Sequence, residues 1–245
     1  QPLAAADHFL AQHGDVRRWS PERGKAKLQR NLGDLGHSIG GRRFGSGKRV
    51  RSRTDGRGRI VVHGGSVARR AAESGVTTAR SAGTSNYADV GLRELAKKGA
   101  IPGPDVLAAG YHVRPQLAAD AFLSDPSLSP FMNGGVTTPD AIRQVVRVNL
   151  SHGVDWIKTT STERAGTPAT DPRKQLYTDA EVGVMVQEAR AKGIPVMAHA
   201  HGAEGALAAV QGGVRSIEHG TYLSDEALAL MKEKGTYLLP AYATV

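Results

Sequence analysis

The sequence predicts an α/β fold, a partial TIM (β/α)8-type barrel with about six to seven of the eight strands. Short apolar runs alternate without interruption with stretches of helical spacing, which is the pattern of a parallel sheet with helices outside it. Glycines follow the helical stretches and end them. The chain of 245 residues is also long enough for one large domain with a substantial core.

The predicted elements follow one another from residue 59. The run RIVVH at 59–63 is a candidate strand that patches one edge of the sheet. Six further strands are predicted at 76–80, 104–110, 154–158, 194–199, 214–219 and 236–240. Helices are predicted at 66–73, 89–98, 139–152, 202–210 and 225–234, and between Thr178 and Gly193.

Capping residues and loop lengths support this order. Thr138 and Ser224 precede two of the helices, and Thr178 with Glu181 forms a capping box. The Pro/Ser/Gly-containing stretch from residue 111 to about 135 exceeds the usual connection between a strand and a helix. We therefore expect this stretch to be an active-site loop.

The positive charge divides the chain into two parts. Residues 1–60 hold 14 Lys/Arg against 5 Asp/Glu, and the remainder is balanced, so the first quarter carries the whole net charge of +9. We predict a basic, Arg/Gly-rich, poorly ordered segment at 1–58 and an incomplete barrel domain at 59–245. Nucleic-acid arms interleave stacking aromatics, but few are available here, Trp19 and Phe44 among them, so a nucleic-acid partner is not the favoured interpretation.

Composition excludes several classes of chemistry. The chain has no cysteine, which excludes disulfides, thiolate metal sites and a cysteine nucleophile. No apolar run approaches the ~18 residues of a membrane helix, so no membrane partner is expected. The cellular compartment stays open, because an absence of cysteine suits reducing and oxidising compartments alike.

Three histidines lie at the ends of two predicted neighbouring strands. His199 and His201 follow the first strand, one helix crosses over, and His219 ends the second strand. Catalytic groups of a parallel barrel lie at the carboxyl ends of its strands. His199 and His201 face the same way, and either can meet His219 across a gap of ~5 Å. Converging neutral imidazoles favour a Zn²⁺-type site; the alternative is a hydrogen-bonded histidine pair at the barrel rim.

Lys158 ends a mostly apolar strand, where a free ammonium group is costly to bury. In one interpretation its amine reaches the rim or pairs with Asp155 or Glu218. In the other, its pKa is lowered and CO₂ carboxylates the amine, giving an anionic bridge between metals. The residues alone leave both interpretations open.

Three stretches resemble the amidohydrolase superfamily, in its branch of imidazolonepropionase-like enzymes and metal-dependent Xaa-Pro or Xaa-Arg dipeptidases. The resemblance covers roughly residues 66–245. The stretches are GVTTARSAGTSNYADVGLRELAKKGAIPGPDVLAAG, HGVDWIKTTSTERAGTPATDPRKQ and PVMAHAHGAEGALAAVQGGVRSIEHGTYLSDEALALMKEKGTYLLPAY.

The resemblance implies a barrel with a metal centre at its rim. It assigns Lys158 as a carboxylated lysine and His199 and His219 as the ligands on strands five and six. These three residues would be the catalytic and metal-binding set, with Zn²⁺ or another divalent metal as cofactor. His201 would instead face the substrate or lie behind the ligands as one of their outer partners. A metal-bound hydroxide would then attack an amide carbonyl.

The sequence also departs from the family pattern. No His-x-His precedes Val76, the nearest candidate, His63, is a single histidine, and no aspartate follows Thr236. Ser81 follows Arg80 where the family usually has aspartate. The resemblance therefore implies that one site of a two-metal centre is retained.

We predict a metal-dependent hydrolase of C–N bonds in a small amide, dipeptide or cyclic amide. Besides His201, the loop residues Tyr87, Arg164 and Arg173 are candidates for binding the substrate. One alternative is a barrel relic that folds and binds without catalysis; another is a basic nucleic-acid-binding protein. Unpaired edges at 76–80 and 236–240 further predict self-association.

Overall fold

The computed structural model describes residues 53–54, 60–61, 65–115, 117 and 125–240. Apart from Arg53–Thr54, the basic segment 1–58 lies outside these residues. Its expected poor order and the domain boundary at residue 58 therefore stay predictions.

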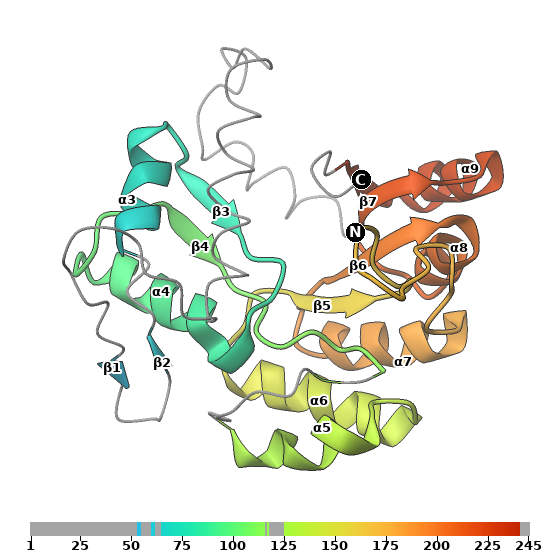
Figure 1. The fold of residues 1–245 in the computed structure, drawn as a ribbon, viewed down its shortest axis with the longest axis horizontal. Helices are drawn as coiled ribbons and strands as arrows, with labels where there is room; N and C mark the ends of the chain where they lie inside the picture. Colours follow the sequence, from blue (N-terminus) through green and yellow to red (C-terminus); the bar gives the residue numbers. More distant parts are fainter. Residues whose placement is uncertain (1–52, 55–59, 62–64, 116, 118–124, 241–245) are drawn as a thin grey trace.

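Six parallel strands in chain order form the framework of the described part (Figure 1). The pairs β3–β4, β5–β6, β6–β7 and β7–β8 are all parallel. The segment after β4 joins it to β5, because the Val113 N–H donates to the Lys158 carbonyl at 2.7 Å. Each strand overlaps a predicted one: β3 (Thr78–Arg80), β4 (Asp105–Leu107), β5 (Ile157–Thr160), β6 (Val196–Gly202), β7 (Ser216–Tyr222) and β8 (Tyr237–Leu239).

The helices lie outside the curved row of strands (Figure 1). The predicted caps at Thr138, Thr178 and Ser224 are confirmed, and each side chain accepts a hydrogen bond from a backbone N–H of the first turn. The helices are α3 (Gly65–Glu73), α4 (Ala88–Lys97), α5 (Ser129–Gly134), α6 (Pro139–Ser151), α7 (Asp179–Arg190), α8 (Ala203–Gln211) and α9 (Asp225–Lys234).

The long loop before residue 135 contains structure that the sequence did not predict. It includes the 3₁₀ turn Pro126–Leu128 and helix α5, and a second such turn, Ser85–Tyr87, precedes α4. These elements are too short to show hydrophobic periodicity, which needs a window of about 11 residues or more.

The expectation that 59–63 patches the edge of the parallel sheet is wrong for its described residues. Strand β2 (Ile60–Val61) pairs antiparallel with β1 (Arg53–Thr54) instead of joining β3. A short hairpin closes a smaller loop than a parallel crossover does, so the local pairing costs less entropy.

Arg80 shows how strongly the sheet curves. Its guanidinium leaves β3, stacks on Trp156 and reaches β7, four strands away in the sheet order. There it donates to both carboxylate oxygens of Glu218 at 2.8 Å and to Ser216 at 3.1 Å. The inward faces of β3 and β7 therefore lie opposite each other, as in a barrel interior.

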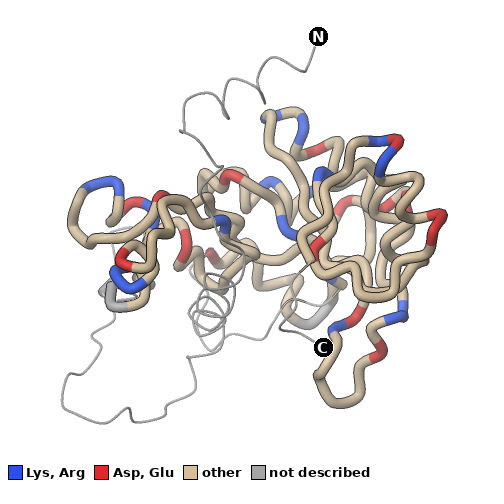
Figure 2. Tube along the Cα trace, turned by 90° about the horizontal axis from the view of Figure 1, so that it is seen from above, with Lys and Arg blue, Asp and Glu red and all other residues tan. Residues whose placement is uncertain are grey.

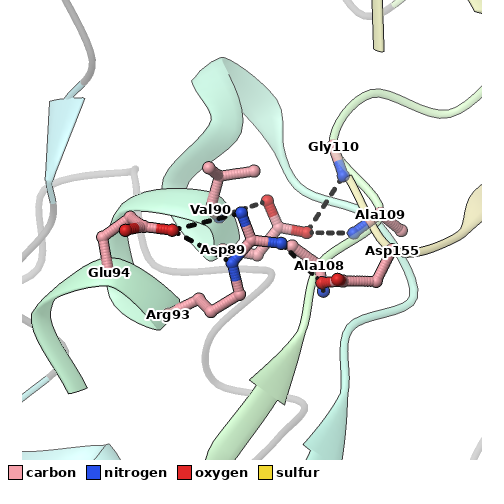
Figure 3. Close-up of polar contacts among 8 residues, drawn as sticks. All are labelled: Asp89, Val90, Arg93, Glu94, Ala108, Ala109, Gly110 and Asp155. Atoms are coloured by element: carbon pink, nitrogen blue, oxygen red, sulfur yellow. Dashed lines mark hydrogen bonds and ion pairs between the residues drawn. The ribbon is translucent and has the colours of Figure 1, made fainter. Parts of the chain in front are cut away.

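A buried polar network joins α4 to the strands (Figure 3). Asp89 in the first turn of α4 accepts hydrogen bonds from the backbone N–H groups of Ala109 and Gly110 at 2.8 and 3.0 Å. Asp155 accepts from the Ala108 N–H and from Arg93 at 2.8 and 2.6 Å. The segment after β4, which leads into the rim of the barrel, is thus fixed by two carboxylates.

The surface of the described part has no dominant charge, but β8 is apolar and exposed. Lys/Arg and Asp/Glu are interspersed along the described chain (Figure 2). Tyr237, Leu238 and Leu239 of β8 are 57%, 39% and 40% exposed. Self-association through this edge stays a prediction. None of the described helices is both long enough and apolar enough to cross a membrane.

Candidate metal centre

The structure brings together His199, His201 and His219 at the carboxyl ends of β6 and β7. One potential ligand atom from each of them lies within 4.8 Å of the other two. The ring centroids are 4.6 Å apart for His199 and His219, and 4.8 Å apart for His201 and His219. His199 and His201 are buried, and His219 is partly exposed.

A backbone irregularity brings His219 into this cluster. The β6–β7 register places Glu218 opposite His199, and His219 opposite Ala200. Residues opposite each other share a face of the sheet, so a regular strand would direct His219 away from His199. Instead, His219 has a φ of 79°, in the left-handed region, and the register shifts just beyond it. This conformation costs a non-glycine residue of the order of 1 kcal/mol, and such strain concentrates at functional sites.

Hydrogen bonds fix the two buried rings. The Nε2 of His199 lies 3.2 Å from the Glu163 carbonyl oxygen, which can only accept, so Nε2 carries the proton. The Nδ1 of His201 lies 2.8 Å from the Thr221 hydroxyl. Among the described residues, the buried His201 Nε2 has no hydrogen-bond partner. Partners of this kind, on the far side of an imidazole, orient histidine ligands in metal sites.

Lys158 lies deeper on the same face of the sheet. It is opposite Met197 in the β5–β6 register, two residues before the position opposite His199. Only 3% of its surface is exposed. Neither predicted ion pair forms with it, because Asp155 pairs with Arg93 and Glu218 pairs with Arg80. Burial, partly offset by Glu218 and reinforced by Arg80 and Arg164, lowers the pKa of Lys158 to about 8.

The electrostatics keep the imidazoles of His199 and His201 neutral. Burial, followed by the charge of Lys158, lowers the pKa of His199 to about 2. The same two causes, in the same order, lower the pKa of His201. Metal ligation requires neutral imidazoles, so these rings need not lose a proton to bind a cation at neutral pH.

The donor set fits a divalent metal such as Zn²⁺. Nitrogens bound tetrahedrally to zinc at about 2.1 Å lie about 3.4 Å apart, so the present spacing needs only small side-chain rotations. The unpartnered, buried Nε2 of His201 is the observation that most favours a missing ligand, because buried polar atoms are almost always paired.

Replacing Lys158 by methionine is expected to stabilise the metal-free protein by about 3 kcal/mol near pH 7. A pKa lowered from 10.5 to about 8 means that the folded state bears the full cost of the buried ammonium group below pH 8. This cost disappears as the pH rises from 8 to 10.5, and the stability difference should disappear with it. Urea unfolding of both proteins at several pH values measures this dependence.

Lys192→Met is the matched control, because Lys192 is exposed and should show neither effect. A Lys158→Met protein that is less stable than the wild type near pH 7 would contradict the assignment of Lys158 as an unpaired buried amine.

The predicted substrate residues occupy different places. Tyr87 is fully buried, stacks on His152 with ring centroids 3.7 Å apart, and packs edge-on against Tyr111. Its ring packs against His152 and Tyr111 rather than against the three histidines, so the structure does not favour a substrate role for it. Arg164 is exposed and contributes to the field at Lys158. Arg173 stacks over Tyr222 at the end of β7, with 4.1 Å between the guanidinium and the ring centroid.

His112 is a residue that the sequence analysis missed. Its ring lies against Gly83, in the loop after β3, where any Cβ would collide with it. Burial, followed by the charges of Lys158, Arg114 and Arg164, lowers the pKa of His112 to about 3. Its buried Nδ1 lacks a partner among the described residues. The signal in the sequence was its place after a predicted strand end, the rule that identified the other three histidines.

The parallel strands and the histidine cluster at their carboxyl ends are the arrangement of an α/β-barrel domain with a candidate metal site. Residues 62–245 match the model of the Amidohydrolase family. The chain belongs to this family, which confirms the resemblance found in the sequence.

Known relatives place the chain near the Xaa-Pro dipeptidases. It is similar to the ochratoxinase of Aspergillus niger, with 28% identity over 153 residues, covering 56% of this chain and 32% of the relative. A crystal structure of an Xaa-Pro dipeptidase with bound methionine has a TM-score of 0.58 and 34% identity, covering 67% of this chain and 42% of that one. A prolidase complexed with N-methylphosphonate-L-proline has a TM-score of 0.61 and 26% identity, covering 72% and 45%. The chain thus spans less than half the length of these relatives.

Proposed function

We propose that the chain forms the metal-binding part of a hydrolase of C–N bonds in small amides or peptides. The observation that carries the proposal is the convergence of His199, His201 and His219 above the buried Lys158. Family membership supports the reaction class, and the similarity to an Xaa-Pro dipeptidase and a prolidase supports a dipeptide substrate.

In this proposal, His199 and His219 bind the metal, together with Lys158 once CO₂ has carboxylated its amine. A divalent metal, zinc or another, would lower the pKa of water at the site and polarise the substrate carbonyl. The donor set corresponds to one retained site of a two-metal centre. The role of His201 depends on which of its ring nitrogens carries the proton.

The chain's own residues prepare this site. The Glu163 carbonyl holds the His199 ring in one tautomer. Burial and the field of Arg80 and Arg164 favour the neutral amine of Lys158, the form that reacts with CO₂. The Arg80–Glu218 pair keeps the carboxylate of Glu218 occupied, so it does not neutralise Lys158 by direct contact.

The surroundings favour a substrate that carries a carboxylate. Arg164 contributes positive charge at both Lys158 and His112, and Arg114 does so at His112. The guanidinium of Arg164 makes no hydrogen bond or ion pair with the described residues. A guanidinium group binds a carboxylate in a bidentate manner, as the free end of a dipeptide or an N-acyl amino acid would require.

The test is hydrolysis of a panel of Xaa-Pro dipeptides and N-acyl amino acids by the full chain. The protein is loaded with zinc in bicarbonate, and His219→Ala treated in the same way is the control. We expect turnover that a chelator abolishes and zinc restores. Stoichiometric metal binding without turnover of any substrate would favour the non-catalytic relic, and absence of both would contradict the proposal.

A further inference from the structure

Thr160, the last residue of β5, has a buried hydroxyl group beside the candidate metal centre. The residue is 6% exposed, and its Oγ1 has no hydrogen-bond partner among the described residues. The preceding threonine differs, because the Thr159 hydroxyl donates to the Val113 carbonyl at 2.9 Å. The large majority of buried polar side-chain atoms are paired, so the Oγ1 of Thr160 calls for a partner that the described part of the chain does not supply.

The register of the sheet places Thr160 one step above Lys158 on the same face. Thr160 is opposite His199, and Lys158 is opposite Met197, so both side chains of β5 point to the side that carries His199. Two residues of a strand that share a face lie about 6.6 Å apart. The four-carbon stem of a lysine spans a similar distance, so a group on its nitrogen can reach the level of Thr160.

The amine of Lys158 lies on the side of the rim. Burial, followed by the charge of this amine, lowers the pKa values of both His199 and His112. These two rings belong to the strand segments on either side of β5, so the amine lies between them, close to the position of Thr160. Within the described part of the chain, the amine forms no ion pair.

Carboxylation of Lys158 would create an acceptor for this hydroxyl. The lone pair of the neutral amine attacks the carbon of CO₂, one C=O electron pair moves onto oxygen, and the nitrogen releases a proton to water. The product is a carbamate whose two oxygens share one negative charge. Because the proposed centre has one divalent metal, the second carbamate oxygen needs a hydrogen-bond donor in this buried place. A hydroxyl group donates one hydrogen bond, and bonds to a charged acceptor are the stronger ones.

We propose that Thr160 is a positioning residue, whose hydroxyl donates a hydrogen bond to a carbamate oxygen of carboxylated Lys158. The hydrogen bond stabilises the carbamate and directs its other oxygen toward His199 and His219. The inference rests on the proposed function and deepens it, because it names the residue that supports the modified lysine. It adds no ligand to the metal, so the position of the attacking water stays open.

The experiment measures carbamate formation by ¹³C NMR in the full, zinc-loaded chain, titrated with ¹³C-labelled bicarbonate at constant pH. The carbamate resonance is assigned by its loss in Lys158→Met. Thr160→Val removes the hydroxyl and keeps the shape of the side chain, and Thr160→Ser keeps the hydroxyl. Thr159→Val is the matched control, because it removes a buried hydroxyl of the same strand that faces the other side of the sheet. Elemental analysis and circular dichroism check zinc content and fold, and Thr160→Ala replaces Thr160→Val if the latter does not fold.

We expect Thr160→Val to need about 10–100-fold more bicarbonate than the wild type for half-maximal carbamate, because it loses a hydrogen bond to a charged group. Thr160→Ser and Thr159→Val should stay within about threefold of the wild type. Without zinc and CO₂, Thr160→Val should unfold at the same urea concentration as the wild type or a higher one, because its hydroxyl is then unpaired. Thr159→Val should unfold at a lower concentration, because it loses an existing hydrogen bond.

Two results would overturn the inference and leave the proposed function standing: an unchanged bicarbonate requirement in Thr160→Val, or a Thr160→Ser protein as impaired as Thr160→Val. Zinc binding by a wild type without a carbamate resonance would overturn the inference and the role of carboxylated Lys158, and would leave the histidine site. Absence of both zinc and carbamate in the wild type would overturn the inference and the proposed function together.

Discussion

His219→Ala is expected to abolish stoichiometric zinc binding. The variant removes one of the three imidazoles whose ligand atoms lie within 4.8 Å of one another. Removing a residue that only hydrogen-bonds to a metal ligand lowers metal affinity about 10–100-fold. Removing a ligand itself should therefore lower the affinity by more than about 100-fold. Elemental analysis after zinc loading and dialysis measures bound metal per chain, and circular dichroism checks the fold.

His152→Gln is the control for histidine replacement. His152 lies at the end of α6, pairs with Asp125 at 2.8 Å and is not part of the cluster. It should retain the metal content of the wild type. Equal zinc content in His219→Ala and the wild type would remove His219 from the site.

Asp89→Ala is expected to lower the free energy of unfolding by about 3–5 kcal/mol. Asp89 is 4% exposed and accepts hydrogen bonds from the N–H groups of Val90, Ala109 and Gly110 (Figure 3). It also accepts one from the Thr84 hydroxyl. Alanine would leave the buried N–H groups after β4 without an acceptor, which costs about 1–3 kcal/mol for each. Urea unfolding followed by circular dichroism gives the change.

Asp105→Ala makes the same substitution at an exposed position of β4 and should change stability by no more than about 0.5 kcal/mol. Similar effects of the two variants would show that the Asp89 hydrogen bonds do not hold α4 against the segment after β4.

The alternation of strands and helices was predictable because each element carries its own local signal. Strands β3 to β8 each overlap a short run that contains apolar or β-branched residues, and the caps at Thr138, Thr178 and Ser224 mark three helix starts. The pairing of Ile60–Val61 with Arg53–Thr54 was not predictable, because the residues of an isolated apolar run do not indicate which strand it pairs with. The short helix α5 lacked enough length to show a period.

The cluster of histidines was predicted from strand ends and spacing, but its geometry was not. A regular β7 would have directed His219 to the helical side, and only the left-handed backbone at His219 and the bulge after it bring the ring back. Neither feature has a residue pattern that periodicity can detect. The same holds for the Arg80–Glu218 pair, which joins residues 138 positions apart.

The burial of Lys158 was predictable, because the residue lies on a mostly apolar strand. Its lack of an ion pair was not, because it depends on which partners Asp155 and Glu218 have. Asp155 pairs with Arg93, and Glu218 pairs with Arg80. Both pairs join residues that are distant in the sequence, so a local sequence pattern does not predict them. His112 was missed because its strand end falls inside a long loop, although the structure places it within the field of Lys158.

The most direct test of a metal centre on β6 and β7 is an anomalous difference map at the zinc absorption edge, from crystals of the full chain grown with zinc and bicarbonate. We expect one strong peak within about 2.1 Å of a ring nitrogen of both His199 and His219. A map without a peak at these histidines, from crystals in which their side chains are well ordered, would contradict the assignment of a metal-dependent hydrolase site.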